Sequence, residues 1–372
     1  MLIWKLSNFI SFISYMNKLS IFYLSVFCTL LLAGGCTDDG CLSDTDTPVF
    51  LQPSFSTASN VSVRSIVNET GTATGQVNKI GAYLTRTDGH TAYADPAMVY
   101  TTFATTNGTT WGGAKKLNLR TEQARLYAWY PDNGTAPTES GTTRTIPLTL
   151  PAAQTFDGTS TTACSQTDYL YGSASNTAGD ATAITVSATN ATPTVYLQHA
   201  LAQLVFTIEY KAGRVPDSEY DYVKSISLTT GTGTSVFSAA NAAGTLALND
   251  GTITLAPTTT ITFTATAGTS QLPGNIGAPK PVAYGLVAPK AKDETSTNPI
   301  SLNLVLGQKS ASTNDRTLTA ANAALFNGEW KKGHRYTYNL QLDKNDITLK
   351  SVEIKAWTEK DGGSQDVPPV IE

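Results

Sequence analysis

The chain has 372 residues, of which 41% are hydrophobic and 9% aromatic, and its formal net charge is -4. This composition excludes a disordered chain, and the absence of a basic stretch excludes a nucleic-acid partner. The length is sufficient for two domains of ordinary size. Threonine is abundant and only 15% of residues are charged. Because threonine favours strands over helix interiors, the composition predicts an all-β protein.

The first expected element is an export signal. The apolar run from Ile21 to Leu32 is shorter than the ~20 residues that a membrane-spanning helix needs. Met16, Asn17 and Lys18 precede it, so we expect a signal peptide over residues 1–35, with residues 1–15 an over-extended start. The run ends in Ala33-Gly34-Gly35-Cys36, which resembles a bacterial lipobox. This predicts lipidation at Cys36; an ordinary signal followed by a chance cysteine is the alternative.

An acidic tether is expected after the anchor, over residues 36–48. Its start, Thr37-Asp38-Asp39, resembles the tags that send lipoproteins to the outer surface of some Gram-negative anaerobes. Several acyl chains on one residue anchor more firmly than a single chain does. The aspartates lack the order of a calcium loop. The sequence therefore predicts an exported lipoprotein at the outer membrane or cell surface, without a metal.

Four cysteines are present, and two of them are expected to remain free for pairing. Cys28 leaves with the signal and Cys36 takes the lipid. Cys41 and Cys164 can pair in an oxidising compartment, and whether they do is left open.

From residue 49 onward, short alternating segments are separated by Gly, Asn and Thr clusters, a pattern typical of antiparallel sandwiches. We expect two sandwich domains in tandem, over residues 49–194 and 195–372. Pro147 should place its strand at an edge, and residues 155–194 should be mostly loop. A helix is expected over 319–326. The expected strands cover 80–84, 125–130, 144–150, 197–210, 222–229, 253–255, 261–265, 282–287, 302–306, 336–342 and 347–357.

Residues 197–210 show the clearest alternation, with Leu204, Phe206 and Ile208 on one face. We therefore expect Phe206 to be a core residue, and His199 to serve packing or hydrogen bonding.

No catalytic, metal or cofactor motif is present. His90, His199 and His334 show no ligand spacing, and neither a nucleophile elbow nor a phosphate loop occurs. The sequence thus predicts a protein that is not an enzyme and has no cofactor. Four tryptophans could stack on sugars or serve the core equally well: Trp111, Trp129, Trp330 and Trp357.

Several segments together resemble the fimbrillin family, the subunits of type V pili. Besides the lipobox they are Asp168-Tyr-Leu-Tyr171, His199-Ala-Leu-Ala-Gln-Leu-Val-Phe206, the run from Asn327 to Leu340, and Ile354-Lys-Ala-Trp357. The resemblance implies two transthyretin-like β-sandwich domains and a lipoprotein precursor carried to the cell surface, where it joins a fimbrium. It also implies that a trypsin-like protease removes the first strand, so that a neighbouring subunit donates a strand in its place.

On this resemblance, residues 55–67 would be the removable segment and Arg64 the candidate processing site, unless Arg64 is an ordinary exposed strand residue. The partners implied are other pilus subunits, the outer membrane through the lipid, and a host or bacterial surface glycan or protein.

The C-terminus suggests where the subunit stands in a polymer. The apolar alternation slips at Lys350-Ser351, which predicts a bulge or a turn. Pro368 and Pro369 lack the amide hydrogens that a donor strand needs, so a tip or minor adhesive component is favoured over a stalk subunit. A surface glycan-binding lipoprotein of a nutrient-uptake system is the alternative function, and a secreted hydrolase is disfavoured.

Overall fold

The computed structural model describes residues 48–57, 77–94, 98–158, 166–214, 219–231, 234–274, 279–293, 299–308, 311–320 and 324–357. Within these residues the regular elements are mainly β-strands, and the helical element is the short 3₁₀ turn η2 (Ala324–Asn327). The strands belong to one compact unit that begins at Val49. The expected all-β class is confirmed, while the division into two transthyretin-like domains near residue 194 stays a prediction.

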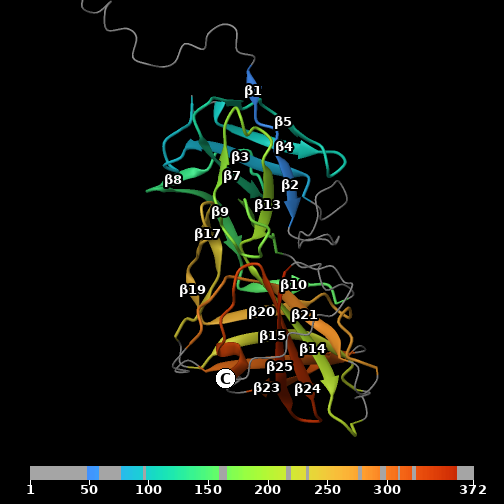
Figure 1. Ribbon diagram of the computed structural model, residues 1–372. Coiled ribbons are helices and arrows are strands. Elements are labelled where there is room, and N and C mark those ends of the chain that lie inside the picture. Colours follow the sequence, from blue (N-terminus) through green and yellow to red (C-terminus); the bar gives the residue numbers. More distant parts are fainter. Residues whose placement is uncertain are drawn as a thin grey trace, which may run out of the picture. The chain divides into compact units, whose positions relative to one another are not determined.

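The largest sheet has eight strands in the order β2-β13-β11-β7-β3-β4-β5, with β12 paired to β7 beside that path (Figure 1). Its strands are β2 (Ser54–Thr57), β3 (Lys79–Arg86), β4 (Tyr100–Thr105), β5 (Trp111–Gly113), β7 (Ala124–Tyr130), β11 (Leu170–Ser173), β12 (Ile184–Val186) and β13 (Thr194–His199). The central strands β3 and β7 are buried on both faces. In β3, Ile80 through Thr85 are all buried and only the end residues Lys79 and Arg86 are exposed, while β7 is buried except for two half-buried residues.

Two further sheets mix strands from distant parts of the chain. A four-stranded sheet has the order β18-β17-β9-β8, and a five-stranded sheet has the order β10-β20-β15-β22-β23. Figure 1 shows β17 beside β9, and β10 beside β20. The strands are β8 (Thr138–Ser140), β9 (Thr143–Leu150), β10 (Ala153–Phe156), β15 (Tyr222–Thr230), β17 (Ala240–Ala247), β18 (Ile253–Thr254), β20 (Thr260–Ala265), β22 (Ile300–Gln308) and β23 (Ala311–Ala320).

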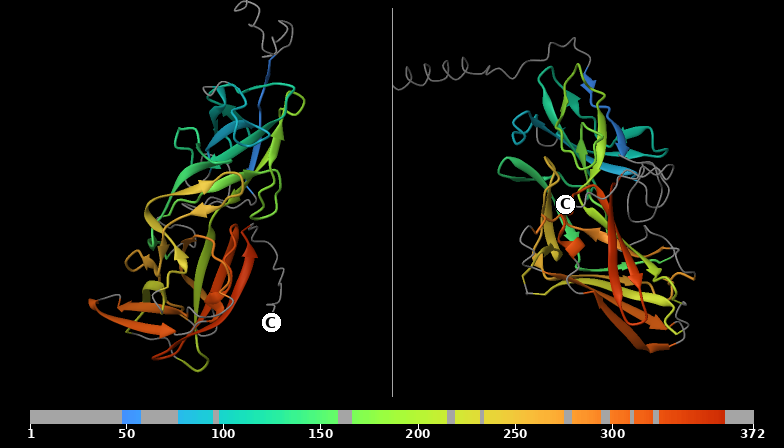
Figure 2. Two further views of the ribbon diagram at one scale, coloured as in Figure 1. Left: turned by 90° about the vertical axis from the view of Figure 1, so that its left-hand side faces the viewer. Right: turned by 60° about the horizontal axis from the view of Figure 1, so that its bottom comes forward.

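The last four-stranded sheet has the order β21-β14-β24-β25, and Figure 2 shows its two C-terminal strands in red. Its strands are β14 (Ala202–Tyr210), β21 (Lys280–Val287), β24 (His334–Leu342) and β25 (Ile347–Ala356). Two short pairs complete the fold: β1 (Val49–Phe50) with β6 (Asn118–Leu119), and β16 (Phe237–Ser238) with β19 (Pro257–Thr258).

The core between the five-stranded sheet and the sheet β21-β14-β24-β25 is built on aromatic residues. Phe206 of β14 is fully buried, with its ring centroid 5.7 Å from that of Phe263 and 5.7 Å from that of Tyr338. Gln154 adds a polar link, since its side chain donates to the carbonyl of Leu286 (2.5 Å) and accepts from the amide of Leu286 (3.0 Å). The core role expected for Phe206 is confirmed.

The expected strand over 197–210 proves to be two strands in different sheets. The chain bends at Ala200–Leu201, so that β13 ends in the eight-stranded sheet and β14 begins in the four-stranded sheet. The bend is satisfied by main-chain bonds from Ala200 N to Tyr169 O and from Gly333 N to Leu201 O, each 2.9 Å. Because residues on both sides of the bend are buried, the alternation in the sequence continues through it and hides it.

The helix expected over 319–326 was wrong. Strand β23 continues to Ala320, pairing Leu318 with Leu304, and the helical part is the short η2. Alternating burial, with Leu318 and Ala320 inside and Thr319 outside, makes this segment a strand. The sheets are also not purely antiparallel, because β2–β13, β10–β20 and β14–β24 are parallel pairs. The expectation that Pro147 places its strand at an edge was wrong, because β9 lies between β17 and β8. Pro147 fits there because β9 extends beyond β8, so that this residue has one neighbour, Thr245.

Candidate functional site at the N-terminal strand

The N-terminal segment lies along an edge of the eight-stranded sheet. Strand β2 is the terminal strand of this sheet and pairs with β13 in parallel, Thr194 opposite Ser54 and Leu197 opposite Thr57. From Leu51 to the start of β2, the amides of Leu51, Gln52 and Ser54 donate to three carbonyls of neighbouring loops at 2.8–3.0 Å. The segment is therefore held mainly by backbone hydrogen bonds, which any strand of suitable length can make.

The side chain of Phe55 fixes the position of β2. It is 6% exposed and fits between two aromatic residues, with ring centroids 5.6 Å from Phe103 and 4.9 Å from Trp111. Leu51 is buried as well. Burial of a side chain such as Phe55 contributes ~1.5–3 kcal/mol, so this segment is anchored by a few apolar residues at alternate positions.

Removal of β1 and β2 would leave an incomplete sheet. Strand β13 would lose its partner on that side, and Phe103 and Trp111 would lose the ring that packs between them. An unpaired edge next to an apolar trough is a template for another strand. We refer to this trough, formed by β13, Phe103 and Trp111, as the N-terminal groove.

The C-terminal strand β25 is the opposite kind of element, since it is terminal in its sheet and mostly exposed. Within the part of the chain that the structure describes, β25 pairs with β24 alone. Ser351 faces Asn339 and Leu349 faces Leu340, which leaves Lys350 as the extra residue of a bulge. The irregularity expected at Lys350-Ser351 is thus a bulge within one strand. Beyond it, Ile354 is 54% exposed.

A buried trio closes the end of β25. His199 Nδ1 lies 2.8 Å from Asp168 Oδ2, and the imidazole stacks on Trp357 at 3.9 Å. The main-chain N–H of Trp357 donates to Gly333 O (2.7 Å). The packing role expected for His199 is confirmed, and three segments that the sequence analysis singled out meet here.

The tryptophans are mostly core residues. Trp129, Trp330 and Trp357 are buried, and Trp330 has Phe237 stacked on it at 5.7 Å. Trp111 is partly buried and packs on Phe55. Its contact with Phe55 could not be found from the sequence, because it depends on strands that are distant along the chain.

The remaining predicted site residues, Cys36 and Arg64, lie outside the described residues, as do Cys41 and Cys164. Among the described residues, no helix is long and apolar enough to cross a membrane. In the same part of the chain, no three His, Cys, Asp or Glu side chains gather as a metal site.

A family model described as fimbrillin-like matches residues 66–357. No curated protein matches the sequence.

Among solved structures, a protein of Bacteroides uniformis named "putative cell adhesion protein" is similar with a TM-score of 0.52 and 15% identity, covering 85% of this chain and 100% of that one. A protein of the same description from Bacteroides ovatus has a TM-score of 0.50 and 17% identity, and the match covers 84% of this chain and 99% of that one. A fimbrial protein of Bacteroides vulgatus has a TM-score of 0.46 and 14% identity, and the match covers 84% of this chain and 100% of that one. At these identities the first two similarities show a shared fold.

Proposed function

Since the chain belongs to the fimbrillin-like family, we propose that it is a structural or adhesive subunit of a cell-surface pilus. The observation that carries the proposal is the N-terminal groove. A short terminal strand fills it, held by main-chain bonds and by Phe55 between Phe103 and Trp111. Such a strand can be exchanged for an equivalent strand of another subunit without rearrangement of the rest of the sheet.

Assembly would begin with proteolysis. Arg64 is the only Arg or Lys between Val49 and Asn78, so cleavage after it by a trypsin-like protease would separate β1 and β2 from the rest of the chain. The freed groove would then accept a strand of a neighbouring subunit, and each such junction would complete a core. The lipid on Cys36 would hold the precursor at the outer membrane until then.

The C-terminus supports a proposal for the position in the pilus. The bulge at Lys350 interrupts β25, and the prolines at 368 and 369 suit a central donor strand poorly. We therefore place this subunit at the tip or among the minor components. Deletion of residues 361–372 should leave incorporation into pili unchanged, and loss of polymerisation would instead make this segment the donor strand.

Electron microscopy of cells that produce the chain, with gold-labelled antibodies against it, tests the proposal. We expect gold on filaments, concentrated at their ends. If the gold instead covers the cell body evenly and the filaments carry no gold, the result would contradict the proposal and favour the surface glycan-binding lipoprotein.

A further inference from the structure

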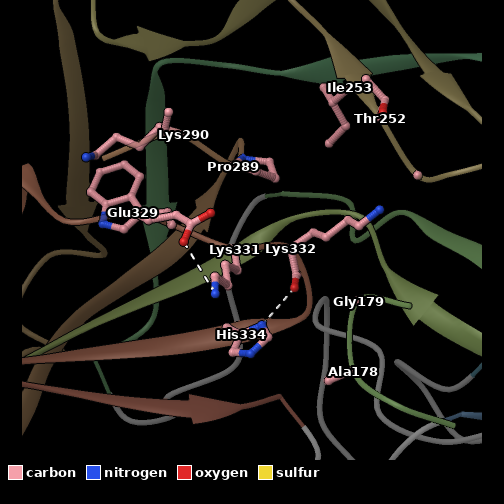
Figure 3. Close-up of a pocket in the computed structure, with 13 residues that line it drawn as sticks. Ala178, Gly179, Thr252, Ile253, Pro289, Lys290, Glu329, Lys331, Lys332 and His334 are labelled. Atoms are coloured by element: carbon pink, nitrogen blue, oxygen red, sulfur yellow. Dashed lines mark hydrogen bonds and ion pairs between the residues drawn. The ribbon is translucent and has the colours of Figure 1, made fainter. Parts of the chain in front are cut away.

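A cavity of about 510 Å³ lies outside the N-terminal groove (Figure 3). Four segments distant in sequence line it: residues 178–179, 251–253, 289–291 and 329–332, with His334 completing the wall. Cavities of ~300–1,000 Å³ are typical of small-molecule sites. Its volume therefore suits a ligand the size of a sugar.

The backbone of one wall is fixed by two glycines in direct contact. Gly179 and Gly333 have φ angles of +74° and +66°, a conformation that favours glycine. A Cβ on Gly333 would lie 2.8 Å from the amide nitrogen of Gly179, and one on Gly179 would lie 2.8 Å from the carbonyl of Lys332. This close approach leaves the wall little freedom, so the cavity is formed before any ligand arrives.

Two half-buried lysines of the lining share one unusual arrangement. Lys290 donates to the carbonyl of Gly328 and lies over the ring of Trp330 (4.9 Å). Lys332 donates to the carbonyl of Asp250 and lies over the ring of Tyr171 (5.0 Å). Among the described residues, no carboxylate forms an ion pair with either ammonium. The direct contacts that the structure gives each ammonium are thus with a neutral carbonyl and an aromatic ring, and each ammonium keeps donors for a further acceptor.

The carboxylates around these lysines act from a distance. Asp293 and Glu329 influence Lys290, and Asp180 and Asp250 influence Lys332. Burial nevertheless lowers the pKa of both lysines, that of Lys290 to about 8. The protonated forms are therefore poorly compensated where they are.

The rest of the lining offers groups for a hydroxylated ligand. Figure 3 shows Glu329 and Lys331 meeting, with their charged atoms 3.4 Å apart, and His334 Nδ1 beside the carbonyl of Lys332 at 2.9 Å. Glu329 and Lys331 are about half exposed. Thr252 is an exposed residue of the lining, and Pro289 and Ile253 give the lining an apolar part. The lining thus combines three ammonium groups, one carboxylate and apolar contacts.

We propose that this cavity binds a carboxylate-bearing sugar of monosaccharide size, such as a uronate. The carboxylate would accept a charge-assisted hydrogen bond from Lys332, and the sugar hydroxyls would donate to Glu329 and exchange bonds with Thr252. The charge of Glu329 opposes a doubly charged group, which disfavours phosphate and sulfate as ligands. The inference is independent of pilus assembly, because binding can be measured on the unassembled chain.

Isothermal titration of the full-length chain with glucuronate, and with glucose at the same ionic strength, tests the proposal. We expect glucuronate to bind at least about tenfold more tightly than glucose, as a charge-assisted hydrogen bond provides. Thr252→Trp should fill part of the cavity from its exposed wall, and Lys332→Met should remove one ammonium while keeping its apolar stem. Each should weaken glucuronate binding at least about tenfold.

Two matched variants serve as controls. Thr254→Trp places the same side chain on an exposed residue of β18 that does not line the cavity, and Lys224→Met removes an exposed lysine that pairs with Asp315. Both should bind glucuronate as the unmodified chain does. Equal affinity for glucose and glucuronate, tighter binding of inorganic phosphate, or undiminished binding by Thr252→Trp would each overturn the proposal.

Discussion

The imidazole of His199 lies flat against the indole of Trp357, with ring centroids 3.9 Å apart and planes inclined by 6°. On its other side the imidazole is held by Asp168 (2.8 Å). His199 is the last residue of β13, whereas Trp357 follows β25 directly. This stack therefore joins the eight-stranded sheet to the end of the C-terminal strand, whose own residues are mostly exposed.

Replacement of Trp357 by Ala should release the end of β25. The side chain is 1% exposed, and truncation of a buried tryptophan costs ~3–5 kcal/mol. Urea unfolding measures the loss in the free energy of unfolding. Ile354→Ala, three residues earlier and on the exposed surface, should change it by less than ~0.5 kcal/mol. Similar costs for the two variants would show that Trp357 does not anchor the strand.

Phe206, the central aromatic residue of the core around Phe263 and Tyr338, can be tested in the same way. Phe206→Ala should destabilise by ~3–5 kcal/mol, because the ring contacts Phe263, Phe326 and Tyr338. Phe206→Leu should cost clearly less, since it keeps most of the volume. A cost below ~1 kcal/mol for the alanine variant would contradict the packing described above.

Lys290 gives a prediction for the dependence of stability on pH. Burial lowers the pKa of its ammonium to about 8 from the ordinary 10.5. Between these two values the unfolded chain binds more protons than the folded chain, so the contribution of Lys290 to the free energy of unfolding rises with pH. Below pH 8 the ammonium is protonated in both states, and the cost of burying its charge lowers the free energy of unfolding in full. Above pH 10.5 the group is neutral in both states, and this cost is gone.

Lys290→Met should therefore stabilise the chain by about 1 kcal/mol at pH 7, after allowance for solvent screening. The gain should fall as the pH rises from 8 to 10.5. Lys224→Met, at an exposed lysine paired with Asp315, should show no such gain. Unfolding by urea at pH 7, 9 and 10.5 measures both variants, and a gain that is equal at all three would contradict the assignment.

Cys36 can be tested separately from assembly. Cys36→Ala should leave the chain unlipidated, so that it no longer fractionates with outer membranes after cell lysis. Cys41→Ala is the matched control and should fractionate as the unmodified chain does. Persistence of the Cys36→Ala chain in the outer-membrane fraction would show that the lipobox interpretation is wrong.

Much of the fold could be predicted from the sequence, because alternation reports directly on burial. Strands such as β15 and β24 have one buried and one half-buried face, and their positions were found within a few residues. The bend at Ala200–Leu201 was missed because both faces are buried there. The helix near residue 320 was wrong because alanine and threonine are compatible with either period, and pairing with β22 decided for the strand.

The candidate site could be predicted from the sequence only in part. The sequence marked Phe55 as the beginning of a removable segment, but its contacts with Phe103 and Trp111 depend on how strands assemble. The same is true of the cavity. Lys290 lies over Trp330 and Lys332 lies over Tyr171, and both aromatic residues are distant in sequence from the lysines they contact, so no local pattern predicts these contacts.

Limited digestion with trypsin tests the central claim, exchange of the N-terminal strand, most directly. The chain and its Arg64→Gln variant are digested, the new N-terminus is sequenced, and each digested chain is mixed with pilus subunits from the producing cells and followed on denaturing gels. The account predicts a new N-terminus at Ser65, loss of β1 and β2, and a complex with another subunit that survives on the gel for the unmodified chain, with neither cleavage at this position nor a complex for the variant. A chain that loses β1 and β2 yet takes up no other subunit would contradict it.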